Sequence, residues 1–141
     1  MTSIANDSIS LRRALQVDAV ASGSMGLLFL VGAGALEPLL GLPTILLRDV
    51  GLLLIPFAGF LLWLAPRASA FPALVRTVVG ANVLWVIASL VLLVSGRVEP
   101  TTLGTIFVAV QAVAVAAFAY MEHRAAARDG NPAAAASATG R

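Results

Sequence analysis

Polar and apolar residues alternate along this chain in long blocks. Four apolar runs, each interrupted by only a few polar residues, cover residues 14–34, 44–64, 74–94 and 103–120. Each run approaches the roughly 20 residues that a helix needs to cross the hydrocarbon layer of a membrane. The pattern therefore predicts an all-α integral membrane protein, folded as a four-helix bundle.

The composition agrees with a membrane protein. Hydrophobic residues make up 60% of the chain and charged residues 11%, whereas soluble domains carry about 25% charged residues. The chain contains no cysteine, which excludes disulfide bonds, thiolate metal sites and thiol–disulfide chemistry. All nine basic residues are arginines near the ends of the apolar runs, where they can meet lipid phosphates. We therefore expect the lipid bilayer, and not nucleic acid, as the partner of the basic residues.

The arginines are distributed unevenly between the two sides of the predicted bundle. One side carries Arg12, Arg13, Arg67, Arg76, Arg124, Arg128 and Arg141, and the other carries Arg48 and Arg97. Positive charge marks the cytoplasmic side of a membrane protein. This distribution predicts a multi-pass protein with both termini in the cytoplasm and with external turns at residues 34–43 and 95–101. The aromatic residues Trp63, Phe71 and Tyr120 fall near the cytoplasmic ends, where an interfacial belt is expected.

Three segments follow from these boundaries. Residues 1–13 form a polar N-terminal segment that we expect in the cytoplasm, and residues 14–124 form the transmembrane domain. Residues 125–141 are rich in alanine and contain an Asp-Gly-Asn-Pro helix breaker at 129–132. Because the last residues have no apolar face to bury, we predict that 125–141 is a disordered cytoplasmic tail.

The two predicted external turns resemble each other. Both contain a Glu-Pro pair, at residues 37–38 and 99–100, and the same offset with small gaps places Asp18 near Asn82. One interpretation is a duplicated helical hairpin in parallel orientation, related by an axis along the membrane normal. The other is that Glu and Pro are common residues at helix starts. The sequence leaves both open.

Asp18 is the strongest single candidate for a functional residue. It lies about one turn inside the cytoplasmic end of the first run, where an unpaired carboxylate costs about 2.5 to 3.5 kcal/mol. Ser22 follows four residues later on the same helix face. Asp18 could serve as a proton or cation site, or it could be a structural partner of Arg76 or of Asn82.

Further polar residues line one face of the third run. Asn82, Trp85 and Ser89 have the spacing i, i+3 and i+7, which places them on one side of a helix, and Gln111 is the only amide in the fourth run. A shared polar cavity or proton site is one hypothesis for these residues. The alternative is a set of interhelical hydrogen bonds, worth about 0.6 kcal/mol each in membranes. The complete candidate set is Asp18, Ser22, Arg76, Asn82, Trp85, Ser89 and Gln111.

Small residues recur at four-residue spacing in the first run. Ala19 precedes Gly23, and Ser22 precedes Gly26, by four positions each. Such spacing lets helix backbones approach closely in a membrane. The partner helix could belong to the same chain, to a second copy in a homodimer, or to a larger membrane complex.

The sequence contains no recognisable catalytic or cofactor motif. His123 is the only histidine, so one chain cannot form a bis-histidine haem site or a multi-histidine metal site. The chain also has no Gly-rich phosphate loop, no Gly-x-Ser-x-Gly and no pair of carboxylates within one run. We therefore predict no catalytic residues, no cofactor, no metal and no enzymatic activity.

Two short stretches carry a resemblance to known proteins. Residues 11–15 (Leu-Arg-Arg-Ala-Leu) with Asp18 and Ser22, and residues 81–85 (Ala-Asn-Val-Leu-Trp), resemble the small, uncharacterised four-span bacterial inner-membrane proteins, and more loosely the DoxX-like group. These families share size, span count and short turns with this chain. The resemblance implies a fold and a location in the bacterial inner (plasma) membrane, but no activity.

Two functions therefore remain in view. The sequence favours a non-enzymatic accessory or structural protein of the inner membrane that binds a partner protein or lipid. The alternative is a small proton-coupled transporter or channel that uses Asp18.

Overall fold

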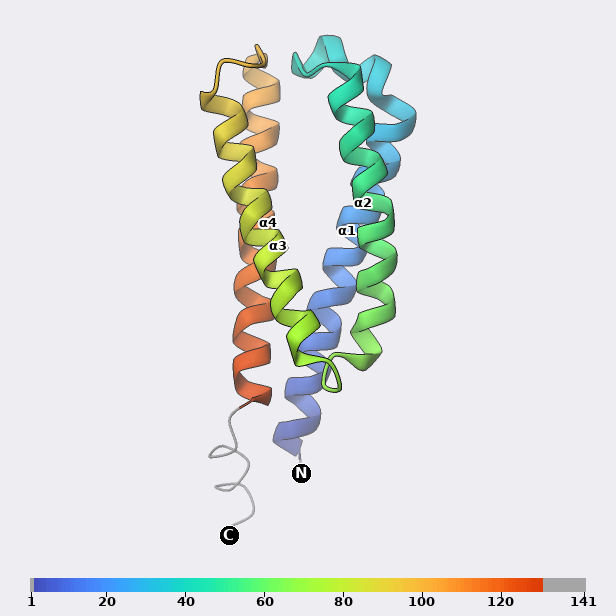
Figure 1. Ribbon diagram of the computed structural model, residues 1–141, viewed down its shortest axis with the longest axis vertical. Helices are drawn as coiled ribbons and strands as arrows, with labels where there is room; N and C mark the ends of the chain where they lie inside the picture. The colour runs from blue at the N-terminus through green and yellow to red at the C-terminus, as the bar shows by residue number, and fades with distance from the viewer. Residues whose placement is uncertain (1, 131–141) are drawn as a thin grey trace.

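The structure is a computed structural model that describes the backbone of residues 2–130 and the side chains of residues 11–130 except Asp129. Residues 131–141, which belong to the predicted tail, lie outside the described residues. The described part contains no strand, and its helices follow one another in a simple order (Figure 1). They are α1 (Thr2–Leu40), α2 (Thr44–Leu64), the short 3-10 helix η1 (Ala65–Arg67), α3 (Pro72–Val94) and α4 (Thr102–Asp129). The predicted all-α, four-helix architecture is confirmed.

Four helical segments are long and apolar enough to cross a membrane. They are Leu11–Leu40, Thr44–Arg67, Pro72–Val94 and Thr102–Arg128. In a bilayer every backbone polar group needs an internal partner, and a helix provides one for nearly all of its own groups. The structure is thus that of a multi-pass membrane protein.

The first helix is longer than the sequence pattern predicted. α1 contains 39 residues, or about 58 Å at 1.5 Å per residue, and the predicted external turn at 34–43 is helical up to Leu40. The helix ends at Gly41, whose φ of 66° suits a residue without a side chain. The first Glu-Pro pair consequently lies inside α1, whereas the second precedes α4.

The fourth helix also exceeds its predicted length. α4 continues to Asp129, so residues 125–129 are helical and not part of a disordered tail as predicted. Alanine has the highest helix propensity, so the alanine-rich sequence after the apolar run can extend the helix into water. The helix ends where the Asp-Gly-Asn-Pro breaker begins.

The helices form two hairpins that share one interface. α1 packs along α2, α3 packs along α4, and α1 also packs against α4, whereas α2 and α3 approach each other only sparsely (Figure 1). α1 and α2 approach each other very closely at two glycines. A Cβ atom on Gly51 would lie only 2.9 Å from the carbonyl oxygen of Gly26. α1 is therefore the central helix, and the α1–α4 contact has no equally extensive counterpart between α2 and α3.

The two ends of the bundle differ in charge. We call one end arginine-rich, because it carries the exposed side chains of Arg12, Arg13, Arg67, Arg76, Arg124 and Arg128, while the opposite end carries exposed Arg48 and Arg97. Two of the first group rest on aromatic rings, with Arg67 5.1 Å from the Trp63 ring centre and Arg124 5.7 Å from that of Tyr120. α1 starts and α4 finishes at the arginine-rich end (Figure 1).

Two apolar clusters fill the bundle, one towards each end. The inner cluster, near the arginine-rich end, contains Leu11, Leu15, Ala19, Leu61, Leu64, Ala65, Ala68, Val75, Val78 and Ala125. The outer cluster, near the opposite end, contains Phe29, Ala33, Leu40, Leu42, Leu47, Leu54 and Val108. The polar residues of the interior lie between these two clusters.

Thr101 joins the end of α1 to the start of α4. Its backbone N–H donates to the carbonyl of Leu40 at 3.0 Å, and its hydroxyl donates to the carbonyl of Leu39 at 2.6 Å. The same hydroxyl accepts a bond of 3.0 Å from the N–H of Gly104 and so caps α4. Gly104 lies so close to Leu40 that a Cβ atom there would overlap the Leu40 carbonyl. We call this junction the Thr101 clasp.

Candidate functional site

Three polar side chains are buried in the described part of the protein, and all three belong to one cluster. Asp18 on α1 is 1% exposed, Asn82 on α3 is 4% exposed, and Glu122 on α4 is 0% exposed. Ser22, one turn after Asp18, is half-buried beside them. The site therefore draws one buried side chain from each of three helices.

The amide of Asn82 connects the two carboxyl groups. Its Nδ2 donates to Oδ2 of Asp18 at 2.9 Å and to Oε2 of Glu122 at 3.1 Å. The hydroxyl of Ser22 donates to the other oxygen of Asp18 at 2.9 Å. Because an amide nitrogen carries two hydrogens, Asn82 has used both. Oε1 of Glu122 is buried without a hydrogen-bond partner.

The directions of the helices explain why these side chains meet. In an α-helix the Cα–Cβ bond leans towards the N-terminus. α1 and α3 run away from the arginine-rich end, so Asp18 and Asn82 lean towards that end. α4 runs the other way (Figure 1). Glu122 therefore leans towards the opposite end and meets Asp18 and Asn82.

The cluster holds two acids and no base. No ion pair to Asp18 or Glu122 is present among the described residues, and Arg76, the predicted cationic partner, is exposed. Two carboxylates that share one site away from water do not both stay charged. Both carboxyl groups accept a hydrogen bond from the one side-chain nitrogen of Asn82, so they lie side by side. Such a pair can share one proton.

The arrangement suits a proton better than a metal ion. The positive edge of the Asn82 amide faces both carboxyl groups, in the position that a bound cation would need. Among the described residues, no three His, Cys, Asp or Glu side chains come together as metal ligands.

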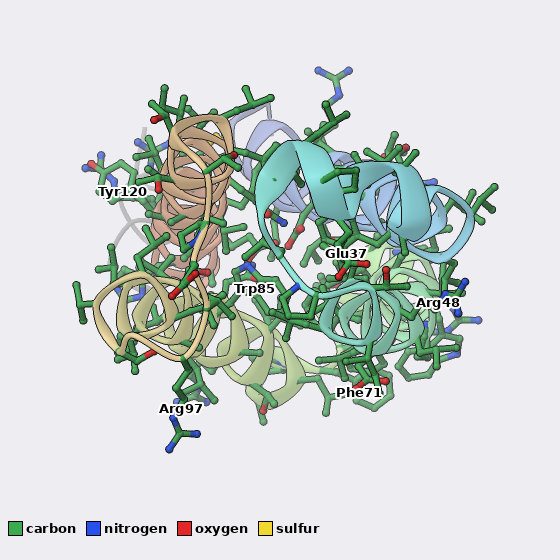
Figure 2. All side chains as sticks on the ribbon, turned by 90° about the horizontal axis from the view of Figure 1, so that it is seen from above. Glu37, Arg48, Phe71, Trp85, Arg97 and Tyr120 are labelled. Carbon is green, nitrogen blue, oxygen red and sulfur yellow. The ribbon has the colours of Figure 1, made fainter. Side chains whose placement is uncertain are left out.

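Apolar residues flank the site along the bundle axis. Leu15, Val78 and Ala125 lie about one turn from the three polar residues, on the side of the arginine-rich end, and all are buried. On the other side Trp85, one turn from Asn82, packs against the outer cluster. Viewed along the bundle, Trp85 lies in the middle of the molecule, whereas Arg48, Arg97 and Tyr120 lie at its edge (Figure 2).

The structure brings together three of the seven predicted site residues. Asp18, Ser22 and Asn82 are joined by hydrogen bonds. Of the two structural partners considered for Asp18, Asn82 makes the contact. Arg76 does not, because its side chain points to the surface at the arginine-rich end.

The other three predicted residues do not join the hydrogen-bonded cluster. Trp85 is half-buried against the outer cluster. Ser89 donates to the carbonyl of Trp85 at 2.8 Å, within its own helix, as serine often does when no outside acceptor is available. Gln111 is half-buried and lies about three turns from Glu122 along α4.

Sequence reasoning missed Glu122. It follows the last apolar run and stands beside His123 and Arg124, so it was not among the predicted site residues. A signal existed, because Ala112, Ala119 and Glu122 are spaced by seven and three residues. This spacing places them on one helix face, and all three are buried.

Comparison with known proteins finds no family model, no curated relative and no solved structure that matches this chain.

Proposed function

We propose that this chain is a non-enzymatic, multi-pass protein of the bacterial inner membrane that binds a proton between Asp18 and Glu122 and acts as a small proton-coupled transporter. One observation carries the proposal: within residues 11–128, whose side chains the structure describes, two fully buried carboxyl groups share a single amide and have no cationic partner. The arginine bias supports an orientation with the arginine-rich end in the cytoplasm.

Glu122 favours transport over a purely structural role. Asp18, Ser22 and one hydrogen of Asn82 already form a satisfied contact between α1 and α3. Glu122 adds a second acid and leaves one buried oxygen unpartnered, which lowers the stability of a structural contact. Ionisable residues inside a membrane bundle are typical of proton relays and of ion and substrate pathways.

An accessory or structural role is the second candidate. The observation in its favour is that the Asn82 amide contacts both α1 and α4 from α3, so that one side chain ties three helices together. In this case the cluster would stabilise the bundle, and the protein would act through a protein or lipid partner. A homodimer or a larger membrane complex fits this role.

Proton flux into liposomes separates the two candidates. The purified protein is reconstituted with an entrapped pH dye, and a pH gradient is imposed while the membrane potential is clamped with potassium and valinomycin. We expect proton entry above that of protein-free liposomes, and we expect Glu122→Gln and Asp18→Asn to abolish the difference.

Glu99→Gln is the matched control, because Glu99 is an exposed carboxyl in the turn at the opposite end. It should retain the flux of the parent protein. Equal flux in protein-free liposomes and in liposomes with the folded parent protein would contradict the transporter proposal and favour the accessory role.

A further inference from the structure

The proton site is unequally distant from the two ends of the bundle. Glu122 lies seven residues before Asp129, the last residue of α4, and twenty residues after Thr102, the first. At 1.5 Å per residue these distances are about 10 Å and about 30 Å. Along α3 the difference is smaller, because Asn82 lies ten residues after Pro72 and twelve residues before Val94. Both helices nevertheless place the site nearer to the arginine-rich end, so a proton from that end has less protein to cross.

The barrier on the short side consists of small and aliphatic side chains. Leu15, Val78 and Ala125 each lie one turn from a residue of the site, and Leu11 and Val75 lie another turn away. We call the first three residues the inner seal. No hydrogen bond links α1 to α3 or α4 between this seal and the arginine-rich end, as far as the described residues show. The helices are joined there by apolar contact alone.

The barrier between the site and the opposite end is thicker and is held closed by hydrogen bonds. Trp85 and the outer cluster fill the bundle beyond the site. At the opposite end the Thr101 clasp fixes the end of α1 to the start of α4 with two hydrogen bonds. Parting these helices requires breaking both bonds.

From these contacts we infer that the carboxyl pair exchanges its proton with water only at the arginine-rich end, where the inner seal opens, while the outer cluster and the Thr101 clasp stay closed. This inference rests on the proposed proton site. It deepens the proposal by naming the face from which the proton is taken. Transport would then require a separate, slower opening of the outer cluster.

Few charged groups surround the site, so a pH response there can be assigned to Asp18 and Glu122. Asp18 on α1 and Glu122 on α4 are the buried titratable groups of the described part, and α3 contributes only the neutral Asn82. α2, on the other side of α1, contributes Ala58 near Gly23 and no charged group at this level. The side chains of Arg76, His123 and Arg124, on the same two helices as Asn82 and Glu122, are exposed.

Single-cysteine labelling tests the inference without background, because the chain contains no cysteine. Val78→Cys and Ala125→Cys report on the inner seal, and Ala33→Cys and Val108→Cys report on the outer cluster. Ala70→Cys and Ser95→Cys are exposed at the arginine-rich end and the opposite end, and they show which end a membrane-impermeant maleimide reaches in spheroplasts and in inverted vesicles.

We expect both seal variants to react when the reagent reaches the Ala70→Cys end. Their rates should be about ten times those of the outer-cluster variants from either side, a ratio that corresponds to an opening free energy lower by about 1.4 kcal/mol. Outer-cluster variants that react from the Ser95→Cys end as fast as the seal variants react from the other end would overturn the inference. Val78→Cys and Ala125→Cys lie on different helices, so the test can still be made if one of the two variants does not fold.

The same experiment distinguishes the inference from the proposed function. If the site binds a proton, the labelling rate of Val78→Cys should change with pH, and the change should disappear when Glu122→Gln is added. One-sided labelling that is insensitive to both pH and Glu122→Gln would support the access route and contradict the proton site. Two-sided labelling that changes with pH would support the proton site and overturn the access route.

Discussion

Asp18 and Glu122 lie on the first and last helices of the bundle, and both accept a hydrogen bond from the same side-chain nitrogen of Asn82. An amide nitrogen that donates twice compensates part of the negative charge of each acid, but it carries no net charge. The pair is therefore held together without being neutralised. This property is the basis of the proton site proposed above.

A double-mutant cycle measures the contact between Asp18 and Asn82. Asp18→Ala and Asn82→Ala should each lower the free energy of unfolding, and the double variant should lose less than the sum, because either change already breaks the bond. The coupling energy should be about 0.6 kcal/mol, and at most about 1.7 kcal/mol, as for interhelical hydrogen bonds in membranes. Reversible unfolding in mixed detergent and SDS micelles gives these energies.

The corresponding cycle with Arg76 is the control. Asp18→Ala and Arg76→Ala should be additive within about 0.5 kcal/mol, because Arg76 is exposed and the two side chains share no partner. A coupling energy as large as that with Asn82 would show that Asp18 forms an ion pair in the membrane.

Trp85 should report on the protonation of the carboxyl pair. It lies one turn from Asn82 on the same helix face, whereas Trp63, the other tryptophan, lies beside Arg67 at the arginine-rich end. In a Trp63→Phe protein the emission of Trp85 should shift during a titration from about pH 4 to about pH 10, which brackets the titration of buried and exposed carboxyl groups.

The shift should depend on both acids. Asp18→Asn and Glu122→Gln each remove one carboxyl group of the pair, so each should displace the titration, and the double variant should be flat. Glu99→Gln should behave like the parent. A shift that survives both site substitutions would mean that Trp85 responds to a different group, and the proton site would then lose its support.

Reporter fusions test the orientation. Six exposed arginines lie at one end of the bundle and two at the other, and positive charge is retained in the cytoplasm. A phosphatase fused after Arg97 should be active, and one fused after Ser69 should be inactive, with the reverse pattern for a fluorescent reporter. Activity at the Ser69 fusion would contradict a cytoplasmic arginine-rich end.

The sequence pattern predicted the fold better than the lengths of its helices. Hydropathy identifies the four spans because burial in lipid requires apolar residues along the whole crossing. It does not mark helix ends in water or in protein, so the extension of α1 to Leu40 was missed, and residues 125–129 at the end of α4 were assigned to the tail. Helix propensity and the position of Gly41 determine these ends instead.

The site was predicted in part for a similar reason. Asp18 and Asn82 interrupt apolar runs, so their polarity draws attention to them in the sequence. Glu122 stands in a polar context beside His123 and Arg124, and only the position of α4 against α1 and α3 shows that it points inward. A contact among three helices is a tertiary property that one-dimensional hydropathy does not record.

The Thr101 clasp makes a prediction about two glycines. A Cβ atom on Gly104 would overlap the carbonyl of Leu40, which is backbone and cannot turn away, whereas a Cβ atom on Gly80 would meet no atom within 4 Å. Gly104→Ala should therefore push the start of α4 away from α1 and break the hydrogen bonds of Thr101. With each bond contributing about 1 kcal/mol, the loss of unfolding free energy should be about 2 kcal/mol or more.

Gly80→Ala is the matched control, because it adds the same methyl group to a helix without a clash. It should leave the unfolding free energy unchanged or raise it slightly, since alanine favours a helix over glycine. Thr101→Val should reproduce part of the Gly104→Ala defect, because it removes the hydroxyl but keeps the backbone bond to Leu40. If both glycine variants unfolded at the same denaturant concentration, α1 and α4 could not be in close contact at this end, and the closed outer barrier would lose its structural basis.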